Sequence, residues 1–295
     1  MLAVAYALVY IVWGSTYLAI RYVVHELPAF TPAGLRFITA GAILLTYARF
    51  RGHAMPTAKQ WRGSAVLGAL LLLGGNGCVM WAEQHVPSGI TALLVATEPF
   101  WIVGMQWLIG GLRPTLRMVA GLLLGLVGVV VLVGLPGQSS VDYRGAFVVV
   151  LGSLSWAIGS FWSNRLPKSA LAESAFVSSG AQMLCGGLCL IIVGAVTGEP
   201  ARIAQTHVSV TAIVAFWYLV VFGSIITFNA YVWLVRHEPP ARVATYAFVN
   251  PVVAVLIGWL LADEPLSRAT LVAAVTICFA VGLVVTSRSA PHSTG

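Results

Sequence analysis

The sequence predicts an all-α, polytopic membrane protein, and three observations lead to this fold class. Of its 295 residues, 59% are hydrophobic and only 8% are charged, whereas soluble domains are about one quarter charged and somewhat under one half apolar. The mean hydropathy is +0.92. The apolar runs approach the ~20 residues that a transmembrane helix needs, and they do not alternate as barrel strands do. This composition excludes a cytosolic enzyme, a secreted disulfide scaffold and a disordered chain.

Charges, prolines and short polar clusters divide the apolar sequence into ten runs, each of which we expect to be a helix. The first run lacks the basic start of a signal peptide and is too long for its core, so we count it as a span. The longest connections, 50–62 and 196–209, are too short to fold alone. The predicted helices cover residues 2–22, 32–49, 63–84, 87–110, 117–134, 145–164, 171–195, 210–235, 239–261 and 268–286.

The basic residues predict the orientation of the chain. The net charge of +7 comes from Lys and Arg spread over short loops, which is typical of membrane topology and not of nucleic-acid binding. With the N-terminus in the cytoplasm, only five of the sixteen Lys and Arg fall on the opposite side. We therefore expect both termini in the cytoplasm. The five are Arg21, Arg36, Arg144, Arg202 and Arg268.

No pattern in the sequence indicates an enzyme, a metal site or a cofactor. The four cysteines lie in apolar stretches, and the spaced pair Cys185 and Cys189 has no histidine or acid beside it. We interpret them as small buried hydrophobic residues. HExxH, GxSxG and Walker motifs are absent. Both aspartates lie in connections, which excludes a paired-aspartate intramembrane protease.

An internal repeat relates the fourth predicted helix to the ninth. A shift of 152 residues aligns Trp81, His85, Pro87, Ala92, Pro99, Val103, Trp107 and Leu108 with Trp233, His237, Pro239, Ala244, Pro251, Val255, Trp259 and Leu260. We therefore expect two five-helix halves, residues 1–137 and 138–295. Because five is odd, the halves cross the membrane in opposite senses. Inverted repeats are typical of secondary transporters, which bind substrate near the midplane between the repeats.

The matched prolines Pro99 and Pro251 are expected to kink helices four and nine near their middle. A proline inside a helix frees the carbonyl four residues earlier, and hydrocarbon tolerates this only where protein or a water-filled cavity satisfies it. A polar residue, Glu98 or Asn250, precedes each proline. Kinks that only shape packing are the alternative. We favour a cavity lining, because both halves place a proline and a polar group at the same position.

Two ionisable residues are candidates for this cavity. Glu98 is the only acid expected deep in a span, where it must be protonated, paired or facing water. It could hold a substrate amine or a coupling proton, and we favour substrate binding or structural pairing. Arg36 lies about one turn into the second helix. Snorkelling to the outer interface is the favoured interpretation, and a bidentate clamp for a substrate carboxylate is the alternative.

Amides and tryptophans within spans complete the candidate site. Asn76 and Asn229 lie at nearly corresponding places, where they could bridge helices or bind ligand. Trp13, Trp101 and Trp156 lie well inside spans, where each indole N–H needs a partner. Bundle packing and a cavity wall for the apolar part of a ligand explain these rings equally well.

Several short motifs resemble the EamA branch of the drug/metabolite transporter superfamily. The resemblance covers essentially the whole chain, and it implies ten helices in two inverted repeats around a central cavity. It also implies a bacterial inner-membrane location and export of small metabolites, amino acids among them. Glu98 is a departure, because members often have an uncharged residue there. The motifs are 13–17 (WGSTY), 75–77 (GNG), 86–89 (VPSG), 96–99 (ATEP), 222–226 (FGSII), 229–231 (NAY), 246–255 (YAFVNPVVAV) and Glu264.

Together these features predict an exporter of amino acids, aromatic ones among them, or of similar small metabolites, working by alternating access with broad selectivity. The alternatives are a passive channel, a multidrug or other-metabolite exporter, and a membrane scaffold. The expected partners are a small-molecule substrate and the lipid bilayer, without nucleic acid, and a monomer would suffice. We expect substrate to bind between Trp13, Asn76, Glu98, Trp101, Trp156, Asn229, Tyr246 and Asn250.

Overall fold

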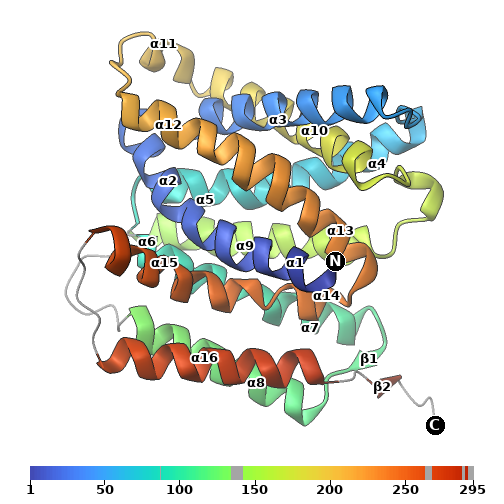
Figure 1. The fold of residues 1–295 in the computed structure, drawn as a ribbon, viewed down its shortest axis with the longest axis vertical. Coiled ribbons are helices and arrows are strands. Elements are labelled where there is room, and N and C mark those ends of the chain that lie inside the picture. The colour runs from blue at the N-terminus through green and yellow to red at the C-terminus, as the bar shows by residue number, and fades with distance from the viewer. Residues whose placement is uncertain (87, 134–141, 263–267, 288–289, 292–295) are drawn as a thin grey trace.

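The computed structural model describes residues 1–86, 88–133, 142–262, 268–287 and 290–291, and these form a helical bundle (Figure 1). Segments η1, η2 and η4 are π-helical insertions within longer helices. In the first half of the chain the elements are α1 (Leu2–Ala7), η1 (Leu8–Val12), α2 (Trp13–Glu26), α3 (Phe30–Phe50), α4 (Ala58–Gly68), η2 (Ala69–Gly77), α5 (Cys78–Ala82), α6 (Ser88–Val95), α7 (Glu98–Leu108), β1 (Leu112–Arg113) and α8 (Leu116–Val133).

The second half has a similar succession of long and interrupted helices. Its short η3 is a 3₁₀ turn. The elements are α9 (Tyr143–Ser163), η3 (Lys168–Ala170), α10 (Ala175–Val196), α11 (Glu199–Ile203), α12 (Val210–Tyr218), η4 (Leu219–Phe228), α13 (Asn229–His237), α14 (Pro240–Val243), α15 (Tyr246–Ala262), α16 (Arg268–Thr286) and β2 (Ala290–Pro291).

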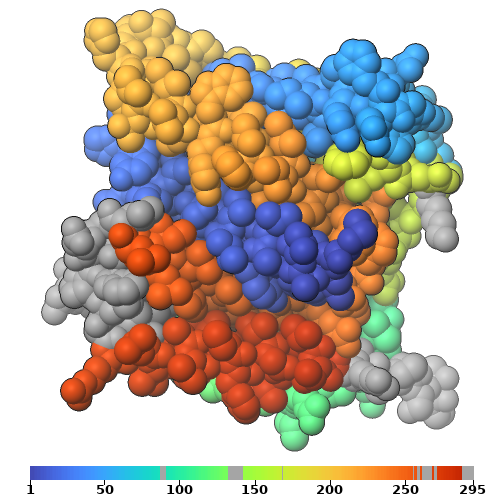
Figure 2. Space-filling model, in the orientation of Figure 1, coloured from blue at the N-terminus to red at the C-terminus, as the bar shows by residue number. Residues whose placement is uncertain are grey.

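Five helical runs are long and apolar enough to cross a membrane, which confirms the all-α membrane class in its general form. In the described ranges the strand content is one antiparallel pair of two-residue strands, β1 with β2. Helix α16 turns large apolar side chains outward, Leu271, Val272, Val275 and Phe279 among them (Figure 2). Such a ridge suits contact with lipid. The five runs are Leu2–Glu26, Ala58–Ala82, Tyr143–Ser163, Ala175–Val196 and Val210–His237.

The main helix contacts join the two halves of the chain. Helix α3 packs along α10 at one edge of the bundle, and α8 packs along α16 at the opposite edge (Figure 1). Between these edges, α9 packs against η2 and α7, while α2 packs against α12 and α15. Neither half is therefore a separate unit, and the centre of the molecule lies where the halves meet.

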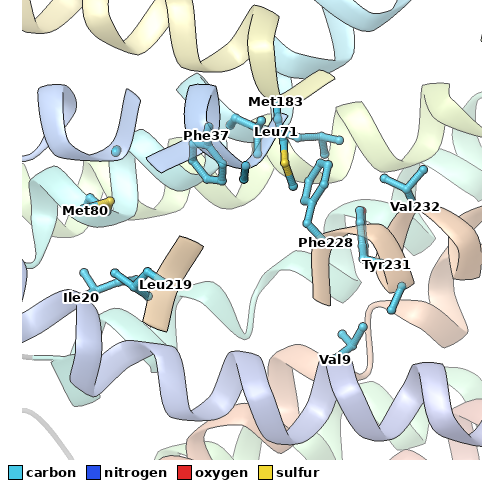
Figure 3. Close-up of a cluster of buried hydrophobic side chains, with 14 of the residues drawn as sticks. Val9, Ile20, Phe37, Leu71, Met80, Met183, Leu219, Phe228, Tyr231 and Val232 are labelled. Atoms are coloured by element: carbon cyan, nitrogen blue, oxygen red, sulfur yellow. The ribbon is translucent and has the colours of Figure 1, made fainter. Parts of the chain in front are cut away.

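Close backbone approach fixes the pairing of α3 with α10. A Cβ atom at Gly41 would lie only 2.8 Å from the carbonyl oxygen of Gly180, and one at Gly187 would lie 2.9 Å from that of Gly34. Small residues allow this approach where packing, and not the hydrophobic effect, must hold helices together. The apolar side chains beside this contact, Phe37 and Met183 included, continue into the central core (Figure 3).

Two carboxylates tie helix N-termini across the halves. Glu26, which ends α2, accepts hydrogen bonds from the backbone nitrogen (2.7 Å) and hydroxyl (2.6 Å) of Ser209, the residue before α12. Glu199 is buried and accepts from the backbone nitrogens of Phe30 (3.1 Å) and Thr31 (2.6 Å) at the start of α3. Both satisfy N–H groups that a helix leaves free and complement the positive end of its dipole.

The structure divides helices four and nine differently from the sequence-based expectation. Helix four breaks at 96–97, so that Pro99 lies in the first turn of α7 and not in mid-helix. An N–H group in the first turn of a helix has no acceptor within that helix. A proline, which lacks this group, is therefore well accommodated there. Helix nine breaks earlier, at 244–245, and α15 continues through Pro251. The two matched prolines therefore occupy different settings.

The cap on α3 gives a first prediction. The variant Glu199→Ala leaves two N–H groups at the start of α3 without their acceptor, and we expect it to lower the free energy of unfolding by about 1–2 kcal/mol. The melting temperature in detergent measures this loss. The matched control is Glu173→Ala, because the Glu173 side chain is exposed. Equal melting temperatures for the two variants would contradict the assignment of Glu199 as a cap.

Candidate functional site

A cavity of about 90 Å³ lies at the centre of the bundle, between helices of both halves. Its wall is unusual for a hydrocarbon-embedded core, because polar side chains converge there from six different elements. These polar residues are Thr16, Arg36, Asn76, Glu98, Ser153 and Asn250. The aromatic residues of the wall are Trp13, Tyr17, Phe37, Trp156, Phe228 and Tyr246.

Six of the eight residues expected to bind substrate lie together in this wall: Trp13, Asn76, Glu98, Trp156, Tyr246 and Asn250. The other two lie elsewhere. Trp101 is 38% exposed, because α7 starts at Glu98 and buries the face through Ile102 and Gln106. Asn229 accepts a hydrogen bond from the Ser179 hydroxyl at 3.1 Å, which links it to α10.

Aromatic rings pack against one another at the cavity wall. The ring of Trp13 lies 5.6 Å from Trp156, 5.2 Å from Tyr231 and 5.1 Å from Tyr246, measured between centroids. The Tyr231 hydroxyl also bonds Ser160 at 2.5 Å. We call Trp13, Trp156, Tyr231 and Tyr246 the aromatic cluster. Because its rings come from α2, α9, α13 and α15, the cluster is held only while these four helices stay together.

Glu98 occupies the first turn of α7 and is 2% exposed. The Tyr246 hydroxyl donates to its Oε2 at 2.5 Å, so the carboxyl of one half is bound by a side chain of the other. The nearby helix N-terminus favours negative charge at this position. The break at 96–97 thus places a carboxyl, supported by a dipole, at the cavity wall.

Arg36 is buried at 3% exposure and lines the same cavity, so snorkelling to the interface does not describe it. Its Nε donates to the Ser224 hydroxyl at 2.7 Å, and its Cζ lies 4.7 Å from the ring centroid of Phe37. Its Nη1 has no hydrogen-bond partner among the described residues. An ionisable residue inside a membrane segment is by default a functional candidate, and this general rule could have placed Arg36 in the site.

The two cavity asparagines have different roles in the structure. With its amide nitrogen facing the backbone, Asn250 donates to the carbonyls of Tyr10 (3.0 Å) and Tyr246 (3.1 Å). It therefore holds α15 against η1. The Oδ1 of Asn76 is buried, and no residue in the described ranges forms a hydrogen bond with it. Asn76 is thus the amide that remains available for a ligand.

Two π-helical segments bring their backbones up to the aromatic cluster. The Trp13 indole nitrogen donates to the carbonyl of Gly223 in η4 at 3.1 Å. In the other half, Gly75 of η2 lies under Trp156, where a Cβ atom would be 2.5 Å from the ring. π-Helical insertions occur often at functional sites, because they displace the following residues from α-helical register. Each half therefore presents a bare backbone to a tryptophan of the other.

The described part of the chain shows no cluster of metal-binding side chains. No group of three or more His, Cys, Asp or Glu side chains there could hold a metal ion. The cavity instead offers one cation, one carboxyl, an amide and aromatic faces, a set suited to reversible binding of a small amphiphile.

Long apolar helices around a central, partly polar cavity are the arrangement expected of a membrane transporter. Comparison with known proteins specifies the family. The model of the EamA-like transporter family matches residues 1–134 and 143–286, and the chain belongs to this family. It is therefore a membrane transporter of the drug/metabolite transporter superfamily, which confirms the resemblance seen in the sequence.

Individual relatives agree with this assignment. The inner membrane transporter YedA of Escherichia coli (strain K12) is 41% identical over 278 residues, which cover 93% of this chain and 87% of the relative. Protein PecM of Dickeya dadantii (strain 3937) is 27% identical over 276 residues, with coverage of 92% and 88%. One solved crystal structure of a protein has a TM-score of 0.77 at 19% identity and covers 96% of both chains, so it shares the fold.

The contact between Gly75 and Trp156 gives a second prediction. In Gly75→Ala the new methyl group overlaps the indole, so the ring or η2 must shift, and we expect a loss of about 1–3 kcal/mol in stability. The control is Gly104→Ala, where a Cβ atom meets nothing within 4 Å. Because alanine favours helix by about 1 kcal/mol, this control should melt no lower than the wild type. Thermal melts that do not separate the two variants would refute the close approach.

Proposed function

We propose that the protein is a secondary transporter that exports amino acids, aromatic ones among them, or similar small metabolites by alternating access. The observation that carries this proposal is the central cavity, whose polar and aromatic wall is shared between the two halves of the chain. Broad selectivity follows from the apolar part of the wall, because such a surface discriminates one methylene group by only about 1–3 kcal/mol.

The proposed architecture is ten spans in two inverted repeats, residues 1–137 and 138–295. Two separate matches of the family model, 1–134 and 143–286, support these halves. The packing supports them as well, because exchange of the halves maps each main contact either onto another main contact or onto itself. The contact of η2 with α9 corresponds to that of α12 and η4 with α2, and α7 on α9 corresponds to α15 on α2. The contacts of α3 with α10 and of α8 with α16 map onto themselves.

The location proposed is a bacterial inner membrane, with both termini in the cytoplasm. The name of the relative YedA places that protein in the inner membrane. Only five of the sixteen basic residues fall on the side opposite the termini, which agrees with the positive-inside rule.

The proposed binding site consists of Trp13, Asn76, Glu98, Trp156, Tyr246 and Asn250, and it omits the more distant Trp101 and Asn229. At about 90 Å³ the cavity is smaller than the ~150 Å³ that accommodates benzene in an apolar protein core. A substrate with a large side chain therefore needs a wider cavity. We propose that the aromatic cluster separates when the transporter opens toward α1 and α13, and that it closes again when the opposite side opens.

A passive channel is less well supported. Conduction needs a continuous polar path, whereas at this cavity Trp13 packs against three other aromatic rings. Unitary currents across a planar bilayer would favour the channel over the transporter.

Flux of radiolabelled amino acids in proteoliposomes tests the proposal. We expect saturable exchange of at least one labelled amino acid, and at least tenfold slower exchange by Trp156→Ala, because this variant removes part of the cavity wall. Trp162→Ala is the matched control, since Trp162 lies on the same helix and is exposed. Flux equal to that of empty vesicles for every amino acid would refute amino acid transport. Equal rates for the two variants would refute the site.

A further inference from the structure

The central cavity contains two buried ionisable groups of opposite charge that do not pair with each other. Arg36 reaches it from α3 and Glu98 from α7, and both line its wall. Within the described ranges the only ion pair joins Arg242 to Glu238, outside the cavity. This is unusual, because a charge in a low-dielectric interior is costly unless a partner compensates it.

The surroundings of Arg36 fix its position and leave part of it unused. Its Nε is bound by Ser224, whose own hydroxyl donates to the carbonyl of Leu219, so this contact is complete. A Cβ atom at Gly223 would lie 2.9 Å from Nη2, which means that the guanidinium packs against bare backbone. Neither Nη1, which is fully buried, nor Nη2 donates a hydrogen bond to any of the described residues. The planar guanidinium is suited to a carboxylate, which it can bind through two parallel hydrogen bonds.

Glu98 is held in a complementary way. Tyr246 donates to Oε2, and the described residues provide no hydrogen bond to Oε1. Asn76, whose Oδ1 likewise has no partner in the described part of the chain, lies in the same wall. A carboxylate and an amide oxygen are both acceptors, and together they suit an ammonium group.

From this arrangement we infer that the cavity selects zwitterions, with Arg36 binding the ligand's carboxylate and Glu98, assisted by Asn76, binding its ammonium group. This inference rests on the proposed transport function and names the chemical class of the substrate. An α-amino acid supplies both charges within a few bonds, so it compensates both buried groups without adding net charge to the membrane interior. A simple amine or a simple acid leaves one of them unpaired.

The aromatic faces then have a separate task. Trp13 and Trp156 cover the uncharged side chain of the ligand. This contact does not involve the ligand's carboxylate or ammonium group. Selectivity for charge and tolerance of the side chain therefore reside in different parts of one cavity.

The test compares ligands that differ only in charge. L-phenylalanine and L-leucine are each titrated into the purified full-length protein beside their N-acetyl derivatives and methyl esters, with calorimetry as the readout. We expect each zwitterion to bind at least about tenfold more tightly than either derivative, because each derivative loses one charge-assisted contact. Derivatives that bind as tightly as the zwitterions overturn the inference, while transport itself remains supported.

Variants assign the two ends of the ligand. We expect Arg36→Gln to lower the binding affinity for the amino acid and for the N-acetyl derivative at least tenfold. Its affinity for the methyl ester should change less than threefold. Glu98→Gln should show the reverse pattern: it should lower the affinity for the amino acid and the methyl ester and leave the affinity for the N-acetyl derivative nearly unchanged. The control Arg49→Gln lies on the same helix at an exposed position and should bind all ligands like the wild type.

The outcomes separate the inference from the proposed function. Uniform weakening of all three ligands in Arg36→Gln indicates a structural role and contradicts the inference. If Arg36→Gln does not fold, the affinities of the wild-type protein for the amino acids and their derivatives still test whether the cavity selects zwitterions. If no amino acid binds and none is transported in liposomes, amino acid transport and the inference both fail.

Discussion

Hydrocarbon offers no hydrogen bonds, so every backbone and charged group within the membrane must find its partner inside the protein or in a cavity. This constraint explains the all-helical chain and the placement of its irregularities. At the break at 96–97, the hydroxyl groups of Ser153 and Thr97 donate hydrogen bonds to the carbonyl oxygen of Leu94. The free N–H groups at the start of α3 are bound by the buried Glu199. The buried ionisable side chains Arg36 and Glu98 both line the cavity.

The same constraint couples the two halves. Glu98 of the first half is bound by Tyr246 of the second, and Trp13 of the first by the backbone of Gly223. Each central group therefore depends on a helix from the other half, and a movement between the halves changes the cavity wall directly. Since the cavity is small, the proposed transport requires such a movement for a substrate to pass. In this way the packing that stabilises the bundle also provides the element that a transporter must move.

Composition and periodicity were sufficient to predict the membrane class, and short motifs to predict the family, because both depend on residues close in sequence. Six cavity residues followed from polar or aromatic character within spans. The positions of Trp101, Asn229 and Arg36 could not be predicted in this way, because they depend on how each helix is rotated about its axis and on what packs against it. The start of α7 at Glu98 turns Trp101 outward. The insertion η4 brings Phe228, and not Asn229, to the wall. The burial of Arg36 depends on Gly223 and Ser224, which lie far away in sequence.

Opposite orientation of the two halves is the central claim, and cysteine labelling tests it most directly. His53, after α3, and Gln205, after α11, are exposed and occupy corresponding connections of the proposed repeats. Each is changed to cysteine in a variant whose four native cysteines, Cys78, Cys185, Cys189 and Cys278, are alanine. In intact cells an impermeant maleimide should label the variant Gln205→Cys and reach His53→Cys only after lysis. Labelling of both positions from the same side of the membrane would contradict the inverted repeat.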